Sequence, residues 1–186
     1  SQVADQDGLR TALAEQAARE PGAAWIRGCN WNEASGLTID RHDLDALAFD
    51  RPVLVAHYTL HQAAVSSAGL DALGIGRNMP DPPGGHVVRA PDGTPTGILV
   101  ERAWSDAQAR SMMAYHDPAR WEDLFRARAF QLLRDGITCV HDAACSPSAE
   151  AVYRRLATSG RLPISVLMMP HGEALLFDGR VHTYEA

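Results

Sequence analysis

The sequence predicts an α/β protein in which an irregular α+β part precedes two or so βα units of an incomplete barrel. In the second part, helical segments alternate with short β-branched runs across tight loops, which is typical of a parallel α/β unit. The first 115 residues do not show this regular alternation of helices and strands. At 186 residues, the chain is long enough to bury a sizeable core.

Apolar spacing and turn residues predict the elements of the first part. Leu9, Leu13 and Ala17 stand at helical spacing and predict a helix over 7–20, which Pro21 ends. The elements expected next are a strand over 23–29, a helix over 40–49, a strand over 53–56 and a helix over 63–73. After them we expect a loop over 76–85, a hairpin with strands 86–90 and 96–101, and a helix over 104–115.

The helix expected over 118–134 has the strongest signals in the chain. Asp117 is its predicted N-cap, Pro118 its first helical residue and Gly136 its C-terminal stop. The elements expected after it are a strand over 137–140, a helix over 148–156 and a strand over 163–169. We therefore divide the chain into an α+β part, residues 1–116, and a part with a helix and two βα units, residues 117–186.

Composition excludes several classes of function. A net charge of −6 argues against nucleic-acid binding, which needs a basic face. No apolar run reaches the roughly 18 residues of a membrane span. The chain has three cysteines without zinc-type spacing, which we interpret as reduced thiols of a cytoplasmic protein. All 17 basic residues are arginine, so the chain has no lysine for a Schiff base, a P-loop or a carboxylated metal bridge.

Five segments carry a resemblance to a known family. They are Trp25–Asn32, Leu44-Asp45 with Asp50–Val53, Ala68–Ile75 with Pro80–Gly85, Asp92–Glu101, and Gly136–Ala143. In this order they resemble amidohydrolase family 3, the group that includes N-substituted formamide deformylase. Two departures lie near the expected substrate side. Asn30 stands where the family has glycine, and Thr59-Leu60-His61 stands where it has Asp-Gly-His, with Ala64 and Ser66 in place of the Trp and Asn that follow.

The resemblance implies a metal-dependent hydrolase that acts on non-peptide amide or formamide C–N bonds. Its fold would be a TIM-type (β/α) barrel that binds one or two divalent ions, zinc or similar, at the C-terminal ends of its strands. Such an ion lowers the pKa of a bound water to about 7. Alignment to the family makes this chain an internal fragment, with an insertion domain before the second and third βα units. We therefore expect no catalytic residue, no metal ligand and no activity in the chain alone.

Two histidine segments are the first candidates for a substrate-binding role. His61 follows a predicted buried strand and lies in a loop, the kind of segment in which substrate-binding residues are often found. Alternatively, His61 caps a helix that begins near Ala63. His141 and Asp142 stand at the C-terminal end of a predicted barrel strand, where a carboxylate could orient the imidazole. Asp142 could equally cap the following loop.

Three further residues have open interpretations. Trp31 and Asn32 are candidates for the mouth of the substrate pocket, as an aromatic wall and an amide, with core packing as the alternative. Glu101 ends a predicted hairpin strand, where we expect a salt bridge with an arginine.

Three functions remain open from the sequence. The first is a segment that shapes the pocket of a metal-dependent hydrolase, with a small-molecule amide as substrate and the remainder of the barrel as partner. The second is a cap or self-association module, which would assemble into a homo-oligomer. The third is a free-standing protein that has lost catalysis.

Overall fold

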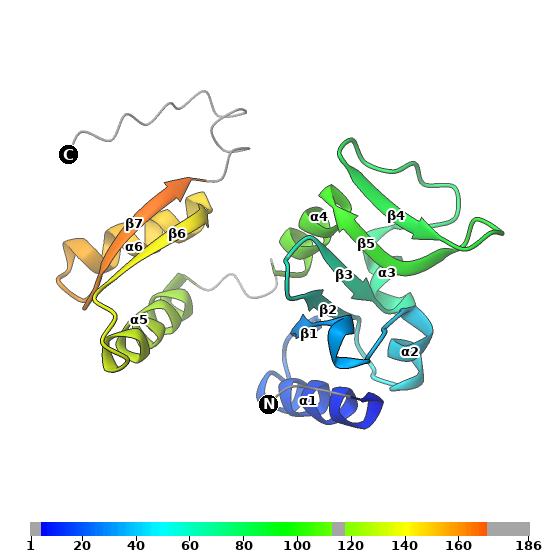
Figure 1. Ribbon diagram of the computed structural model, residues 1–186, viewed down its shortest axis with the longest axis horizontal. Helices are drawn as coiled ribbons and strands as arrows, with labels where there is room; N and C mark the ends of the chain where they lie inside the picture. The colour runs from blue at the N-terminus through cyan, green and yellow to red at the C-terminus, as the bar shows by residue number, and fades with distance from the viewer. Residues whose placement is uncertain (1–4, 113–117, 171–186) are drawn as a thin grey trace. The chain divides into compact units, whose positions relative to one another are not determined.

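The chain forms two compact units, residues 1–115 and residues 116–186. The computed structural model describes residues 5–112 and 118–170, with the elements drawn in Figure 1. No helix in these ranges is long and apolar enough to cross a membrane. Each unit is described by itself.

The first unit is built on a five-stranded mixed sheet. The pair β1–β2 is parallel, and the other three neighbouring pairs are antiparallel. In spatial order the strands are β1 (Ile26–Trp31), β2 (Val53–His57), β3 (Gln62–Val65), β5 (Pro95–Glu101) and β4 (Gly85–Arg89). Its helices are α1 (Gln6–Arg19), the 3-10 turn η1 (Glu33–Ser35), α2 (Arg41–Ala46), α3 (Ser67–Leu73) and α4 (Arg102–Met112).

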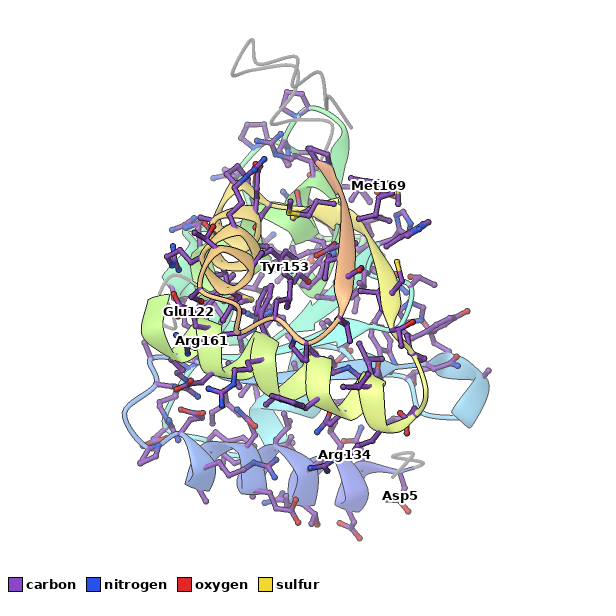
Figure 2. All side chains as sticks on the ribbon, turned by 90° about the vertical axis from the view of Figure 1, so that its left-hand side faces the viewer. Asp5, Glu122, Arg134, Tyr153, Arg161 and Met169 are labelled. Carbon is purple, nitrogen blue, oxygen red and sulfur yellow. The ribbon has the colours of Figure 1, made fainter. Side chains whose placement is uncertain are left out.

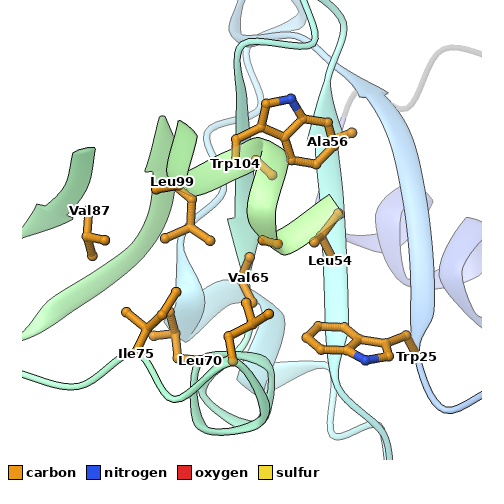
Figure 3. Close-up of a cluster of buried hydrophobic side chains, with 13 residues drawn as sticks. Trp25, Leu54, Ala56, Val65, Leu70, Ile75, Val87, Leu99 and Trp104 are labelled. Atoms are coloured by element: carbon orange, nitrogen blue, oxygen red, sulfur yellow. The ribbon is translucent and has the colours of Figure 1, made fainter. Parts of the chain in front are cut away.

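Helices cover both faces of this sheet because its central strands are apolar on both sides. Alternate side chains of a strand point to opposite faces. Leu54 and Val65 therefore pack with α3 and α4 (Figure 3), whereas Val55 and Ala64 pack with α1 and α2. The unit thus has three layers, with a buried apolar cluster on each side of the sheet.

Local hydrogen bonds hold the short elements of this unit in place. The α2 helix has six residues, too few to form by propensity alone. A capping box stabilises it: Asp40 accepts from the backbone of His42 and Asp43, and Asp43 accepts from the Asp40 N–H. Arg51 joins the end of α1 to the start of β2, because its guanidinium donates to the carbonyl oxygens of Glu20 and Ala23 at 2.8 and 3.0 Å.

The second unit contains two parallel strands and two helices. A helix, α5, precedes β6, and α6 connects β6 to β7 in a crossover. Glu122 on α5 accepts from Arg155 on α6 at 2.6 Å and from Arg161 beyond it at 3.1 Å (Figure 2). These contacts join the two helices at one end. The elements are α5 (Pro118–Arg134), β6 (Cys139–Cys145), α6 (Pro147–Thr158) and β7 (Ser165–Pro170).

Most predicted elements are confirmed, and one is wrong in type. Residues 63–65, predicted as the start of a helix, belong to β3, and the helix begins at Ser67. All three residues are buried, and a short apolar run does not distinguish a central strand from a buried helix. The strand predicted over 137–140 begins at Cys139 and continues to Cys145. The predicted N-cap Asp117 and residues 113–115 of the predicted helix over 104–115 lie outside the described residues.

We expect Ser66→Ala to lower the free energy of unfolding by about 2 kcal/mol. The buried Ser66 hydroxyl accepts from the Val53 N–H at 3.0 Å and from the Gly69 N–H at 3.2 Å, so its loss leaves two backbone donors without their acceptor. Urea unfolding of the chain measures the change. The control is Ser105→Ala, since that hydroxyl is exposed and donates to the carbonyl of its own helical turn. An equal effect of the two substitutions would contradict the prediction.

Candidate functional site

One edge of the five-stranded sheet gathers polar side chains from distant parts of the chain. The strands β1, β2 and β5 end at this edge, and β3 and β4 begin there. The antiparallel register places the end of β2 beside the start of β3, and the start of β3 beside the end of β5. We call this region the polar edge. Its residues are Trp31, Asn32, Glu33, His57, Thr59, His61, Gln62 and Glu101.

His57 is the buried centre of the polar edge. Its Nε2 lies 2.7 Å from Oε2 of Glu33, and its Nδ1 lies 2.7 Å from the Thr59 hydroxyl. The ring also contacts Trp31 edge-on, with centroids 5.2 Å apart, and its side chain is 7% exposed. Both nitrogens are therefore engaged, which favours a structural role for His57.

The Glu33 carboxylate holds the other side of this cluster. Gln62 donates its side-chain amide to Oε1 at 3.1 Å, while Oε2 faces His57. Partial burial works to raise the pKa of Glu33, but a backbone hydrogen bond and the hydrogen bond and charge of His57 outweigh it. The pKa of Glu33 is lowered as a result.

His61 and Glu101 form a second, exposed pair at the polar edge. Nδ1 of His61 lies 3.1 Å from both carboxylate oxygens of Glu101, and the side chains are 67% and 56% exposed. The expected Glu101–arginine salt bridge is therefore wrong, because Glu101 contacts a histidine. The helix-cap interpretation of His61 is also wrong, since the nearby helix begins at Ser67 and has Ser66 as its N-cap.

Three non-glycine residues at this edge adopt a left-handed backbone. The φ angles of Asn30, Leu60 and Glu101 are 66°, 59° and 52°. Asparagine tolerates this conformation better than most side chains. Position 30 therefore suits the glycine of the resembled family segment, and Asn30 is a compatible replacement.

Tertiary contacts stabilise the strained residues Leu60 and Glu101. The indole N–H of Trp104 donates to the Leu60 carbonyl at 2.6 Å, and the Glu101 N–H donates to the His61 carbonyl at 2.8 Å. Strained backbone of this kind persists only where the surrounding structure holds it. The His61 loop is therefore fixed from both sides.

Trp31 and Asn32 have structural roles and also line a cavity. The Trp31 indole N–H donates to the Leu37 carbonyl at 2.9 Å, and Trp31 is part of the core. Asn32 accepts from the Ala34 N–H at 2.9 Å and caps η1. Both residues line a cavity of about 370 Å³ beside α1. Core packing is therefore confirmed for Trp31, while the place of both residues at the mouth of a substrate pocket stays a prediction.

His141 and Asp142 lie in the middle of β6, because that strand runs to Cys145, beyond the end that the sequence predicts. His141 is exposed. Asp142 accepts from the hydroxyl of Tyr153 on α6 at 3.2 Å. Burial, and then the charge of Asp142, raise the pKa of Tyr153, and the same causes raise the pKa of Cys145 to about 11. Tyr153 and Cys145 therefore stay neutral near pH 7.

The described residues do not fit a catalytic metal centre. Within 5–112 and 118–170, no three or more His, Cys, Asp or Glu side chains come together in a group that could hold a metal ion. A catalytic zinc takes three protein ligands. His57 and His61 instead contact two different carboxylates. No step of a metal-assisted reaction is therefore assigned to these residues.

Comparison with known proteins identifies the family. A family model described as "Amidohydrolase family" matches residues 1–182. The chain belongs to the amidohydrolase family. It is 33% identical over 186 residues to YtcJ of Bacillus subtilis (strain 168), described as an amidohydrolase, with 94% of this chain and 34% of the relative covered. It is 30% identical over 158 residues to N-substituted formamide deformylase of Arthrobacter pascens, with 82% of this chain and 29% of the relative covered.

Two solved structures resemble the fold of this chain. A metal-dependent hydrolase from Pyrococcus horikoshii OT3 superposes with a TM-score of 0.60 at 20% identity, and the match covers 92% of this chain and 32% of that one. A metal-dependent hydrolase from Pyrococcus furiosus gives 0.57 at 21% identity, with 97% and 36% covered. The chain thus shares a fold with parts of these two hydrolases. The chain spans about a third of the length of the relatives it matches.

Sequence reasoning missed several residues of the polar edge. Glu33 and Gln62 carry no motif, and Glu33 lies 24 positions before His57. Thr59 lies two positions after His57, so a local turn was the one sequence signal that could have indicated the hydrogen bond between them. The partners of these residues follow from the sheet register, which the sequence does not specify.

We expect Glu33→Gln to reduce the loss of stability that the chain shows in acid. A carboxyl group with a lowered pKa in the folded state stabilises the fold above its unfolded pKa of about 4.3, and this contribution is lost as the pH falls through the folded value. Urea unfolding at pH 7 and at about pH 4 compares the variant with the unaltered chain. Glu15→Gln on the exposed face of α1 is the control. If the free energy of unfolding falls between pH 7 and about pH 4 by the same amount in Glu33→Gln as in the unaltered chain, the prediction is wrong.

Proposed function

We propose that the chain is a segment of a metal-dependent hydrolase that cleaves a non-peptide amide or formamide C–N bond. Its own contribution is to shape the substrate pocket. The observation that carries this proposal is the polar edge, where the exposed His61–Glu101 pair stands on backbone held in a left-handed conformation. N-substituted formamide deformylase, one of the relatives, supports the substrate class.

The substrate-side residues that we assign in the first unit are His61, Trp31 and Asn32. His61 offers an exposed imidazole, and Trp31 and Asn32 line the cavity beside α1. In the second unit we assign His141 and Asp142 on β6. The ion of the whole enzyme is zinc or a similar divalent metal, which supplies an activated water when bound. Its ligands lie outside the described residues.

We further propose how the two parts relate to the whole enzyme. Residues 1–116 form an insertion domain, and residues 117–186 contribute a helix and two βα units to a TIM-type barrel. The parallel β6–α6–β7 crossover supports this, because such units build parallel barrels. The free cysteines Cys29, Cys139 and Cys145 are compatible with a cytoplasmic location.

The 186-residue chain is expected to retain clearly less than one equivalent of zinc after dialysis and to leave a secondary formamide intact. The protein encoded by the complete reading frame around this sequence is expected to bind zinc and hydrolyse that formamide. Metal analysis and amine release measure both, with the Arthrobacter pascens deformylase as positive control. A full equivalent of tightly held zinc in the chain, or an inactive complete protein, would overturn the proposal.

Several exposed apolar side chains in the second unit favour a second candidate, a cap or self-association module. Large apolar side chains are more than a third exposed there, a pattern that marks interaction surfaces. In the hydrolase, the remainder of the barrel would cover them. In the module, a second copy would do so and give a homo-oligomer. These side chains are Leu124, Phe130, Leu133, Ile137, Leu167 and Met169.

Association of the isolated chain distinguishes the two candidates. The module predicts a dimer by light scattering, and Leu124→Ser with Leu167→Ser is expected to return it to a monomer because both side chains are at least half exposed. The control is Tyr58→Ser, an exposed position in the other unit. A monomer at every concentration favours the pocket-shaping segment.

A further inference from the structure

The carboxylate of Glu101 contacts one of the two ring nitrogens of His61. An ionised carboxylate accepts hydrogen bonds and donates none. Both of its oxygens lie 3.1 Å from Nδ1 of His61, so a hydrogen bond to neutral His61 requires a proton on Nδ1. Nε2 on the far side of the ring then has a lone pair, and the side chain is 67% exposed.

We propose that Glu101 is a positioning residue that fixes His61 as its Nδ1–H tautomer, so that Nε2 accepts a hydrogen bond from the N–H of a secondary amide or formamide substrate. This inference rests on the proposed function. It assigns a partner to one substrate atom and a role to Glu101. A tertiary amide has no N–H and cannot make this contact.

The backbone around the pair supports a positioning role. The Glu101 N–H donates to the His61 carbonyl at 2.8 Å, so the two residues are joined through the main chain as well as the side chains. Glu101 adopts its left-handed conformation at the end of β5, and Leu60 does so directly before His61. Such strain clusters at sites that need a fixed geometry.

The surroundings of His61 suit the substituent of an N-substituted amide. Tyr58 and Leu60 belong to the same loop and are 55% and 61% exposed. An aromatic and an aliphatic side chain beside a hydrogen-bond acceptor offer apolar contact for a group on the nitrogen. The acceptor and the apolar contact thus occupy one loop.

Within residues 5–112, two further histidine–carboxylate pairs differ from the His61–Glu101 pair. His57 is buried, and its second nitrogen faces Thr59. His86 contacts Asp81, but Asp81 also accepts from the Val87 N–H at 3.2 Å and fastens the preceding loop to β4. His86 therefore provides a matched control for His61.

The tautomer of His61 can be measured on the chain itself by two-bond ¹H–¹⁵N correlation at about pH 8, where an ordinary imidazole is neutral. We expect His61 to be mainly Nδ1–H in the unaltered chain and mainly Nε2–H, the form that a free histidine prefers, in Glu101→Ala. Asp81→Ala is expected to change His86 and leave His61 as it was. Exposed His42 on α2 serves as the internal reference.

Two results of this measurement would overturn the inference. One is an unaltered chain in which His61 is mainly Nε2–H, which requires no variant. The other is the same tautomer ratio with and without the Glu101 carboxylate, in a variant whose circular dichroism shows the native fold.

Activity of the complete hydrolase provides a second test. Glu101→Ala is expected to lower kcat/KM for a secondary formamide by roughly tenfold, the value of one hydrogen bond, and to leave its N-methylated tertiary analogue within about twofold. Equal losses for the two substrates would overturn the inference. An unaltered enzyme that cleaves neither substrate would instead overturn the proposed function, whereas the tautomer of His61 is measured independently.

Discussion

The burial of β2 on both faces is the constraint on which the first unit depends. All five of its residues are buried, so helices must cover the sheet on both sides. Its two neighbours run in opposite directions, β1 parallel and β3 antiparallel to it. This arrangement brings the end of β1, the end of β2 and the start of β3 to one edge. The position of His57 beside Glu33 and Gln62 follows from it.

Hydrogen bonds to backbone groups connect the five-stranded sheet to the loops of the first unit. The Ser66 hydroxyl contacts both the first residue of β2 and the first turn of α3, while Trp104 reaches the carbonyl of Leu60. Each of these bonds satisfies a polar group that would be costly to leave unpaired in a buried setting. The same contacts that stabilise the core therefore fix the loop that presents His61.

The sequence predicted elements better than it predicted contacts. Caps and stops such as Asp40, Gly74 and Pro118 act within a few residues, so they are visible in a single chain. The β3 strand was missed because Ala63 and its neighbours are apolar on both faces and show no alternation. The pair His61–Glu101 joins residues 40 positions apart, and only the strand register brings them together. Likewise, His141 and Asp142 were assigned to a strand end because Ala143 and Cys145 gave no sign that β6 continues.

Arg51 gives the first unit a support that acid does not weaken. A guanidinium stays charged across the whole pH range in which proteins fold, so its bonds to the end of α1 persist when carboxylates become neutral. Glu33 and Asp81, both with lowered pKa values and both bonded to histidines, do respond to acid, as does Asp92 in the turn between β4 and β5. The Arg51 bonds thus secure the end of α1 at the start of β2, whereas the Glu33–His57 and Asp81–His86 contacts lie at the opposite ends of the strands. Acidification would therefore weaken the Glu33 and Asp81 contacts and leave the Arg51 bonds between α1 and β2 in place.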